Sequence, residues 1–244
     1  TMPSALITGG AVRLGRSFAL HLANKGYGIA LHYGSSAHEA RSTITEIELT
    51  GAKCRQYQCD FRNSTEVEVL IEKVLKEFPD LDLLINNSAN FIQENIEETQ
   101  TLTLANTLNL NLVAPYILMR DYKRKVGRGL IVNILDQRIQ KYIPTFAAYS
   151  VSKSALAHLT QLAAIEWGAS VRVNGIAPGL ILPPPWKKEE YLKQRATQIP
   201  VQDHGQPEDL LRGLDYLLDS HFVNGEILFI DGGESKNSSI PSEI

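Results

Sequence analysis

Residues 4–25 read SALITGGAVRLGRSFALHLANK, in which an apolar run, a glycine-rich turn and an amphipathic stretch follow one another directly. The apolar run Ser4–Thr8 predicts a buried strand, and Leu14–Lys25 places its apolar residues at helical spacing. The free N–H groups at the start of a helix that follows such a turn attract phosphate. The stretch therefore predicts an α/β domain that opens on a phosphate-binding turn; an ordinary tight turn is the alternative.

The same alternation of strand and helix patterns continues along most of the chain. Strands are predicted at Ser4–Thr8, Gly28–Tyr33, Cys54–Gln58, Leu81–Ile85, Gly129–Leu135, Val171–Ala177 and Glu226–Ile230, and helices at Leu14–Lys25, His38–Thr50, Ser64–Glu77, Thr101–Lys125, Ala147–Trp167 and Pro207–Leu218. Near-continuous apolar strands suit a parallel sheet that is covered on both faces. We therefore expect one α/β domain over residues 1–244, with a doubly wound Rossmann-type sheet of seven mainly parallel strands and helices on both faces.

Two segments depart from the alternation. Gly179–Ile199 contains three consecutive prolines, Pro183 to Pro185, and a short charged stretch. It predicts an irregular substrate lid, at about residues 180–199, over the carboxyl ends of the strands. The polar residues from about Ser235 to Ile244 predict a flexible tail.

The composition excludes several classes of protein. Apolar residues make up 43% of the chain and the formal net charge is −3, which suits a buried core and gives no nucleic-acid footprint. No apolar run reaches the length of a membrane span, about 18 residues. The first residues lack the basic region and cleavage site of a signal peptide.

The two cysteines indicate the cellular compartment. On one predicted strand, Cys54 and Cys59 would lie about 16 Å apart, too far for a disulfide. No histidine cluster accompanies them, so no metal site is expected. Reduced cysteines without a targeting segment favour the cytoplasm.

The end of the second predicted strand indicates which nucleotide is bound. Sites for NAD usually place Asp or Glu there to hold the ribose 2′-hydroxyl, whereas residues 33–36 are Tyr33, Gly34, Ser35 and Ser36. Small hydroxyl residues with Arg13 nearby tolerate a 2′-phosphate, so the pattern favours NADPH. Arg13 also suits a pyrophosphate, and a solvated surface arginine is the alternative.

Tyr149 and Lys153 lie four residues apart and so share one face of a helix. An ammonium group next to a phenol stabilises the phenolate and lowers the phenol pKa from its usual value of about 10. Such a pair delivers a proton while a cofactor supplies hydride. Taken alone, the spacing would be an ordinary helix surface.

Several motifs occur together in one order and spacing. They are Thr8-Gly9…Gly15, Asp60, Asn86-Asn87-Ser88-Ala89, Asn111, Tyr149…Lys153, Pro178-Gly179 and Asp231-Gly232-Gly233. In this the chain resembles the short-chain dehydrogenase/reductase family over nearly its full length. The resemblance implies that Tyr149 is the proton donor, that Lys153 holds the nicotinamide ribose and lowers the tyrosine pKa, and that Asn111 supports a water-linked proton relay.

The resemblance also implies a set of cofactor contacts and an assembly. The cofactor-binding residues would be Gly9, Arg13, Leu14, Gly15, Tyr33, Ser35, Ser36, Asp60, Phe61, Asn87, Ser88, Ala89, Tyr149, Lys153, Pro178, Gly179 and Leu180. Within that set, Asp60 and Phe61 would contact the adenine. The family further implies a homotetramer.

Asp136 departs from the common family pattern, which has a serine thirteen residues before the tyrosine. Together with Arg13 and Phe91 it resembles the pteridine reductases, a branch in which the aromatic residue stacks on a pterin. An ionised carboxylate accepts hydrogen bonds and donates none, so it suits a substrate with N–H groups better than a ketone. The substrate residues would be Arg13, Ala89, Phe91, Asp136 and Tyr149. The alternative is that Asp136 only orients Tyr149, or has drifted in an ordinary ketoreductase.

Three functions remain open. The first is NADPH-dependent reduction of a C=N bond in a dihydropterin of the dihydromonapterin, dihydrobiopterin or dihydrofolate type. The second is reduction of a small ketone or 3-oxoacyl substrate. The third is a nucleotide-sensing protein without activity, which the presence of both Tyr149 and Lys153 disfavours.

Overall fold

A seven-stranded sheet forms the centre of the protein. The computed structural model describes residues 2–237. The strands are β1 (Ser4–Ile7), β2 (Gly28–Tyr33), β3 (Cys54–Gln58), β4 (Leu81–Asn86), β5 (Gly129–Ile134), β6 (Val171–Pro178) and β7 (Ile227–Ile230). They pair in the order β3-β2-β1-β4-β5-β6-β7, and every neighbouring pair is parallel. The predicted doubly wound sheet is confirmed.

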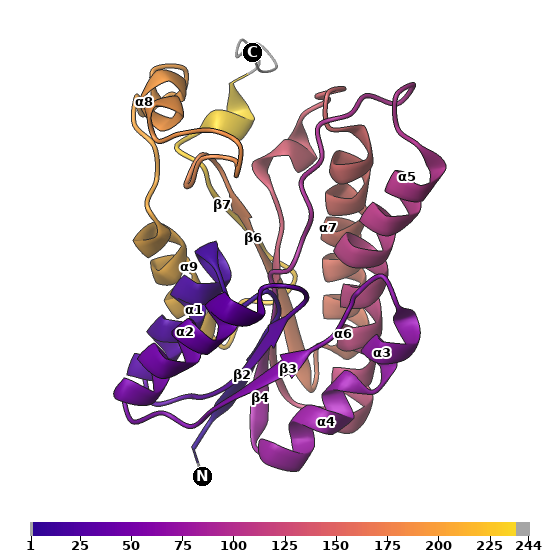
Figure 1. Ribbon diagram of the computed structural model, residues 1–244, viewed down its shortest axis with the longest axis vertical. Helices are drawn as coiled ribbons and strands as arrows, with labels where there is room; N and C mark the ends of the chain where they lie inside the picture. Colours follow the sequence, from indigo (N-terminus) through magenta and orange to yellow (C-terminus); the bar gives the residue numbers. More distant parts are fainter. Residues whose placement is uncertain (1, 238–244) are drawn as a thin grey trace.

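Helices cover both faces of this sheet (Figure 1). They are α1 (Arg13–Asn24), α2 (Ala37–Leu49), α3 (Ser64–Glu68), α4 (Leu70–Glu77), α5 (Thr101–Leu108), α6 (Ala114–Lys125), α7 (Ala147–Trp167), α8 (Glu190–Ala196) and α9 (Pro207–Asp219). Helices α1, α2 and α9 lie on one face, and α4, α6 and α7 lie on the other. Two separate clusters of buried apolar side chains fill the spaces between these layers, and the free thiols of Cys54 and Cys59 belong one to each.

Two predicted helices are divided. The helix predicted at Ser64–Glu77 breaks at Val69, where the backbone leaves ideal helical geometry with ψ of −5°. The helix predicted at Thr101–Lys125 contains a π-helical turn, η1 (Asn109–Val113), between α5 and α6. Single π turns inside helices are frequent at functional sites, and this one carries the predicted site residue Asn111.

The predicted lid is not wholly irregular, because it contains helix α8. Leu192, Arg195 and Ala196 are buried on one side of α8, and their spacing of three and four residues is that of a helix face. The charged stretch thus becomes helical because one of its faces packs against the domain.

The start of the predicted tail is ordered. Glu234–Lys236 form a 3₁₀ turn, η3, in which Ser235 is buried. Its backbone N–H donates to Asp231 Oδ2 at 2.7 Å, which ties the turn to the end of β7. The remainder of the tail prediction, residues 238–244, lies outside the described residues.

Among residues 2–237, one helical stretch has the length and apolar composition of a membrane span. It is Thr101–Lys125, and 39% of its most apolar window is buried inside the protein. Long core helices pass the same test of length and composition. The stretch packs beside α7 and the sheet, and Asn111 and Asp121 are among its buried residues.

Candidate active site

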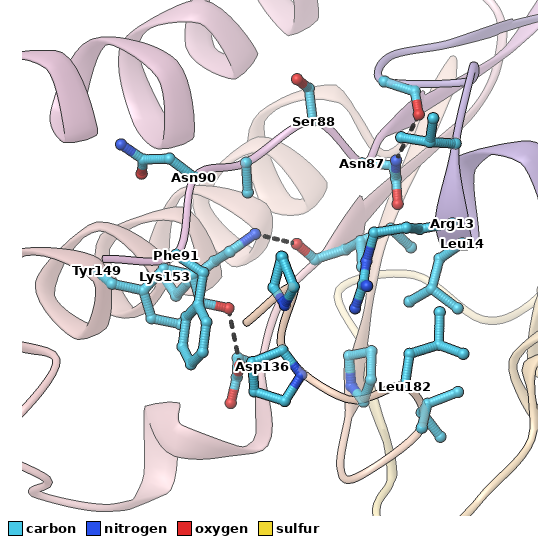
Figure 2. Close-up of a pocket in the computed structure, with 18 of the residues that line it drawn as sticks. Arg13, Leu14, Asn87, Ser88, Asn90, Phe91, Asp136, Tyr149, Lys153 and Leu182 are labelled. Atoms are coloured by element: carbon cyan, nitrogen blue, oxygen red, sulfur yellow. Dashed lines mark hydrogen bonds between the residues drawn. The ribbon is translucent and has the colours of Figure 1, made fainter. Parts of the chain in front are cut away.

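A cavity of about 590 Å³ lies along the carboxyl ends of the strands. Most of the residues that the sequence predicts for the site line it: Gly9, Arg13, Leu14, Tyr33, Ser35, Ser36, Asn87, Ser88, Ala89, Phe91, Asp136, Tyr149, Lys153, Pro178, Gly179 and Leu180. The carboxyl ends of parallel strands meet at one edge of a sheet, which is why motifs far apart in the sequence converge here. Figure 2 shows Arg13 and Leu14 approaching from one side and Phe91 and Tyr149 from the other.

The glycine turn after β1 packs tightly against the first turn of α1. Gly9 has φ of +62°, which glycine adopts without strain. A Cβ at Gly15 would lie 2.0 Å from the carbonyl oxygen of Gly9. Gly15, predicted to bind the cofactor, is absent from the cavity lining. Its lack of a side chain allows α1 to approach the turn. The Asn87 amide donates to the carbonyl oxygens of Thr8 and Gly9 and holds the turn against the strand that follows.

Arg13 has φ of +52°, the left-handed region that non-glycine residues avoid at a cost of about 1–2 kcal/mol. Glycine would adopt this conformation without that cost. The guanidinium donates to the backbone oxygen of Pro183 at 2.8 Å and so joins the glycine turn to the lid. Helix α1, which begins at Arg13, has no side-chain cap at Val12 and no acidic residue in its first turn. Its N–H groups thus suit an anion such as a pyrophosphate.

His32 holds the glycine turn by a hydrogen bond to its backbone, a role that was not predicted from the sequence. Its Nδ1 accepts from the Gly9 N–H at 3.1 Å, and its Nε2 lies 3.0 Å from the carbonyl oxygen of Cys59. Burial lowers the pKa of His32 to about 4, so the ring is neutral near pH 7. Nδ1 accepts, so the proton lies on Nε2 and is donated to Cys59. The signal in the sequence was a polar ring within a strand whose preceding residues are apolar.

Asp60 and Phe61, predicted to contact adenine, are absent from the lining of the cavity. The Asp60 carboxylate accepts two hydrogen bonds from the Arg62 Nε and one from its Nη2. The Phe61 ring stacks on His32 with centroids 4.0 Å apart. Their contact with adenine stays a prediction.

Tyr149 and Lys153 meet Asp136 at the far side of the cavity (Figure 2). Tyr149 lies in the first turn of α7 and Asp136 follows β5, so a helix start and a strand end bring them together. The Tyr149 hydroxyl donates to Asp136 Oδ2 at 2.8 Å. The Lys153 Nζ donates to the carbonyl oxygen of Ile134 at 2.7 Å, and both side chains are buried.

The expected acidic phenol is not what the structure shows. The pKa of Tyr149 is raised well above 10, first by burial and then by the negative charge of Asp136. Burial also lowers the pKa of Lys153 to about 8. Because the Lys153 ammonium is directed at the Ile134 carbonyl, and its Nζ lies 5.8 Å from the Tyr149 ring centroid, it does not offset the effect of Asp136. The phenol is therefore fully protonated near pH 7.

Arg138 partners Asp136 and was also missed from the sequence. Its backbone N–H donates to Asp136 Oδ1 at 2.8 Å, and its guanidinium lies 3.3 Å from Oδ2. The guanidinium further lies 5.2 Å from the ring centroids of both Phe91 and Phe146. Asp136 thus belongs to an ion pair that aromatic rings shield from water.

Phe91 belongs to an aromatic cluster beside this ion pair. Its ring stacks on Phe146 with centroids 4.3 Å apart and on Trp186 of the lid at 5.7 Å. The ring also meets Tyr149 edge-on at 4.8 Å. The predicted flat surface next to the phenol is therefore present. Phe146 and Trp186, which complete it, could not be predicted from the sequence because they lie far from Phe91 in the chain.

Asn111 is buried and does not line the cavity. Its Oδ1 accepts from the backbone N–H of Asn90, and its Nδ2 donates to the Asn90 carbonyl and to Ser152 Oγ. It thereby fixes the segment after β4 against α7. A part in a proton relay stays a prediction.

Among residues 2–237, no group of His, Cys, Asp and Glu side chains is arranged to hold a metal ion. The polar groups of the cavity include the Tyr149 phenol, the Lys153 ammonium, paired carboxylates and guanidiniums, and the first N–H groups of α1. Together they can bind a phosphorylated nucleotide at one end and transfer a proton to a flat substrate at the other.

Comparison with known proteins gives a consistent result. A sequence family described as enoyl-(acyl carrier protein) reductase matches residues 10–235. The chain is 28% identical over 238 residues to 3-oxoacyl-[acyl-carrier-protein] reductase FabG of Staphylococcus aureus, which covers 94% of this chain and 97% of that protein. Its structure is similar to that of FolM alternative dihydrofolate reductase 1 from Brucella suis in complex with NADP, with a TM-score of 0.92, 28% identity and coverage of 99% and 98%. NAD+-bound xylitol dehydrogenase gives a TM-score of 0.85 at 26% identity, with coverage of 95% and 98%.

Proposed function

The chain belongs to the short-chain dehydrogenase/reductase family, and within that family we propose that it reduces a C=N bond of a dihydropterin with NADPH, Tyr149 being the proton donor. The coarser part of this statement, an oxidoreductase that uses a nicotinamide cofactor, follows from the family. The choice of dihydropterin rests on the chemistry of Asp136.

The residues at the nucleotide end fit NADPH. Two similar structures, of FolM proteins from Brucella suis and Brucella canis, are complexes with NADP. In this chain the uncapped first turn of α1 suits the pyrophosphate, and residues 33–36 place no carboxylate against a 2′-phosphate. When bound, the reduced nicotinamide supplies a hydride. Lys153, close to Tyr149 and to the end of β5, would hold the ribose.

The hydrogen bond from Tyr149 to Asp136 carries the proposal. When the phenol turns its proton toward a substrate, Asp136 Oδ2 loses its shortest hydrogen bond in a buried place. A substrate with ring N–H groups restores that bond, whereas a ketone brings only an acceptor. Leaving a buried acceptor without a donor costs about 1–3 kcal/mol, or roughly tenfold to a hundredfold in binding.

The flat aromatic cluster supports the same substrate. A dihydropterin is planar and polar at its edge, so it suits the Phe91 ring on its face and Asp136 at its edge. The Arg13 guanidinium lies at the opposite side of the cavity, where it can contact both the nucleotide and the polar edge of the ring.

Reduction of a 3-oxoacyl or other ketone substrate is the second candidate. The likeness to a 3-oxoacyl-[acyl-carrier-protein] reductase favours it. It requires another group to donate to the carbonyl oxygen, because Asp136 and its partner Arg138 already form an ion pair.

The test is the steady-state rate of NADPH oxidation with a panel of substrates. We expect 7,8-dihydropterins to be reduced with a larger kcat/KM than ketones, aldehydes or 3-oxoacyl thioesters. Tyr149→Phe should abolish turnover, and Tyr142→Phe, at a fully exposed position, is the matched control. Turnover of ketones alone, without pterin turnover or binding, would refute the proposal.

We also propose the homotetramer that the family resemblance implies. Exposed apolar side chains on α5 and α7, among them Leu102, Leu162 and Ile165, support a subunit contact there. Light scattering coupled to size-exclusion chromatography measures the assembly directly, and a monomeric mass would contradict it.

A further inference from the structure

Two ion pairs lie in the wall of the cavity. Arg138 pairs with Asp136, and the Arg195 Nη2 donates to Glu234 Oε1 at 3.0 Å. All four residues line the cavity. The first pair reaches the proton donor directly, because Asp136 Oδ2 accepts the hydrogen bond of the Tyr149 hydroxyl at 2.8 Å. Arg138 is therefore connected to Tyr149 through a single carboxylate.

The local fold fixes the Asp136 carboxylate from the side of Arg138. Asp136 is the N-cap of the 3₁₀ turn η2 (Gln137–Gln140), and its Oδ1 accepts from the Arg138 backbone N–H at 2.8 Å. The Arg138 Nη1 lies 3.4 Å from Oδ1 and 3.3 Å from Oδ2, so it spans both oxygens. With Oδ1 held by the backbone, Oδ2 is the oxygen that is directed at Tyr149.

Two aromatic rings restrain the guanidinium. Its central carbon lies 5.2 Å from the ring centroids of both Phe91 and Phe146, and these rings stack on each other with centroids 4.3 Å apart. The Arg138 side chain is only 14% exposed. A planar guanidinium packs on aromatic rings and keeps its N–H groups in one fixed geometry, which the ammonium of a lysine does not. The site therefore holds Arg138 by its shape as well as by its charge.

The charge of Arg138 has its largest effect when Tyr149 gives up its proton. In the proposed reaction hydride reaches the carbon of the C=N bond, the electron pair of that bond moves to the nitrogen, and the nitrogen takes the Tyr149 proton. The phenolate left behind faces the Asp136 carboxylate across the former hydrogen bond. A guanidinium next to the carboxylate then attracts two negative charges where it attracted one before.

We infer that Arg138 is a positioning residue, which holds Asp136 against Tyr149 and stabilises the phenolate that proton transfer leaves. It acts through Asp136 and not through contact with the substrate. The inference rests on the proposed function, because it takes Tyr149 as the proton donor. The charges around the phenol agree with it, since burial and then Asp136 raise the pKa of Tyr149 and Arg138 opposes them.

A double-mutant cycle on kcat tests the route of the effect. Arg138→Met removes the charge, and we expect it to lower kcat for a 7,8-dihydropterin about tenfold while KM changes less than about threefold. In an Asp136→Asn background the same change should lower kcat less than about twofold, because the neutral amide gives the guanidinium no charge to hold. Equal losses in the two backgrounds, or a loss confined to KM, would overturn the inference.

The solvent isotope effect on kcat is a second readout, and it needs only the single variant. Slower proton transfer from Tyr149 should raise this effect in Arg138→Met, whereas a general loss of active protein would leave it unchanged and overturn the inference. Arg138→Lys keeps the charge and should stay within about threefold of the wild-type kcat. Arg212→Met, at a side chain that is 70% exposed on α9, is the matched control and should keep both values.

Equilibrium unfolding measures the same coupling without any substrate. Arg138→Met leaves the buried Asp136 charge without its arginine, so the urea midpoint should fall further in the wild-type background than in the Asp136→Asn background. Equal falls would contradict the coupling. If Arg138→Met does not fold, Arg138→Gln, whose amide can still donate to the carboxylate, replaces it in the cycle with the same expected results.

The outcomes separate this inference from the proposed function. A wild-type protein that reduces no 7,8-dihydropterin contradicts the proposed function, and the role of Arg138 with it. A wild-type protein that reduces them, together with an Arg138→Met protein that keeps the wild-type kcat and isotope effect, overturns only the role of Arg138.

Discussion

Acidification should weaken the fold through one buried ring, that of His32. In the folded protein the neutral ring accepts from Gly9 and donates to Cys59, and it stacks on Phe61. Protonation would place an N–H against the N–H of Gly9, which has no way to accept it. Burial lowers the pKa of His32 from 6.5 to about 4, whereas in the unfolded chain the ring titrates near its ordinary value.

The direction of the effect follows from where the proton binds. Between pH 6.5 and about 4 the unfolded chain binds a proton at His32 and the folded protein does not. The free energy of unfolding therefore falls as the pH falls through this window, and the contribution is fully present above it. The difference between the two pKa values corresponds to about 3 kcal/mol.

Urea unfolding followed by circular dichroism, repeated from about pH 7 to about pH 4.5, measures this loss. His32→Asn keeps an oxygen acceptor for the Gly9 N–H and does not titrate. It should cost about 1–3 kcal/mol near pH 7 and flatten the decline below pH 6.5. His158→Asn, on the exposed side of α7, is the matched control. A His32→Asn protein with the wild-type slope would refute the assignment.

Three further predictions concern the site. Gly15→Ala places a Cβ 2.0 Å from the Gly9 oxygen, so the dissociation constant for NADPH, measured by fluorescence titration, should rise at least about tenfold, and unchanged affinity would contradict the packing argument. Asp136→Ser should depress dihydropterin turnover and raise ketone turnover in the NADPH oxidation assay; a rise in pterin turnover would contradict the role of the carboxylate as an acceptor. Because burial lowers the pKa of Lys153 to about 8, the ammonium is lost as the pH rises through that value, and kcat/KM for NADPH should fall above about pH 8; a profile flat to about pH 9.5 would show that the charge is not required.

The fold was accessible from the sequence because its strands and helices carry strong local patterns. The strand Gly28–Tyr33 and the helix Ala147–Trp167 have the predicted bounds, since a mostly apolar run and a long helical repeat leave little choice. The π turn at Asn109–Val113 was not accessible, because its residues carry an ordinary helical pattern and the extra residue is a matter of packing.

Most of the residues that line the cavity could also be predicted from the sequence, for a different reason. Parallel strands deliver their carboxyl ends to one edge, so any polar motif that directly follows a strand is placed there. Ion pairs could not be predicted in this way. Arg195 and Glu234 lie 39 residues apart in the chain, and nothing in either local pattern indicates the other. The direction of the Lys153 ammonium, and with it the pKa of Tyr149, likewise depends on a carbonyl from another element.

The raised pKa of Tyr149 bears on which substrate the site can use. A phenol this weakly acidic gives up its proton only to a stronger base, which a substrate nitrogen or oxygen becomes once hydride has reached the neighbouring carbon. The phenolate then left beside Asp136 is a like-charged pair, and this repulsion is part of what raises the tyrosine pKa. Asp136 thus weakens the acid that it orients. For a ketone the carboxylate would offer no hydrogen bond in return, so we expect both effects to slow the reaction. For a ring with N–H groups, the bond from substrate to Asp136 compensates. Under the proposed function, we therefore expect Asp136 to disfavour ketones in two ways, through the missing donor and through the weaker acid.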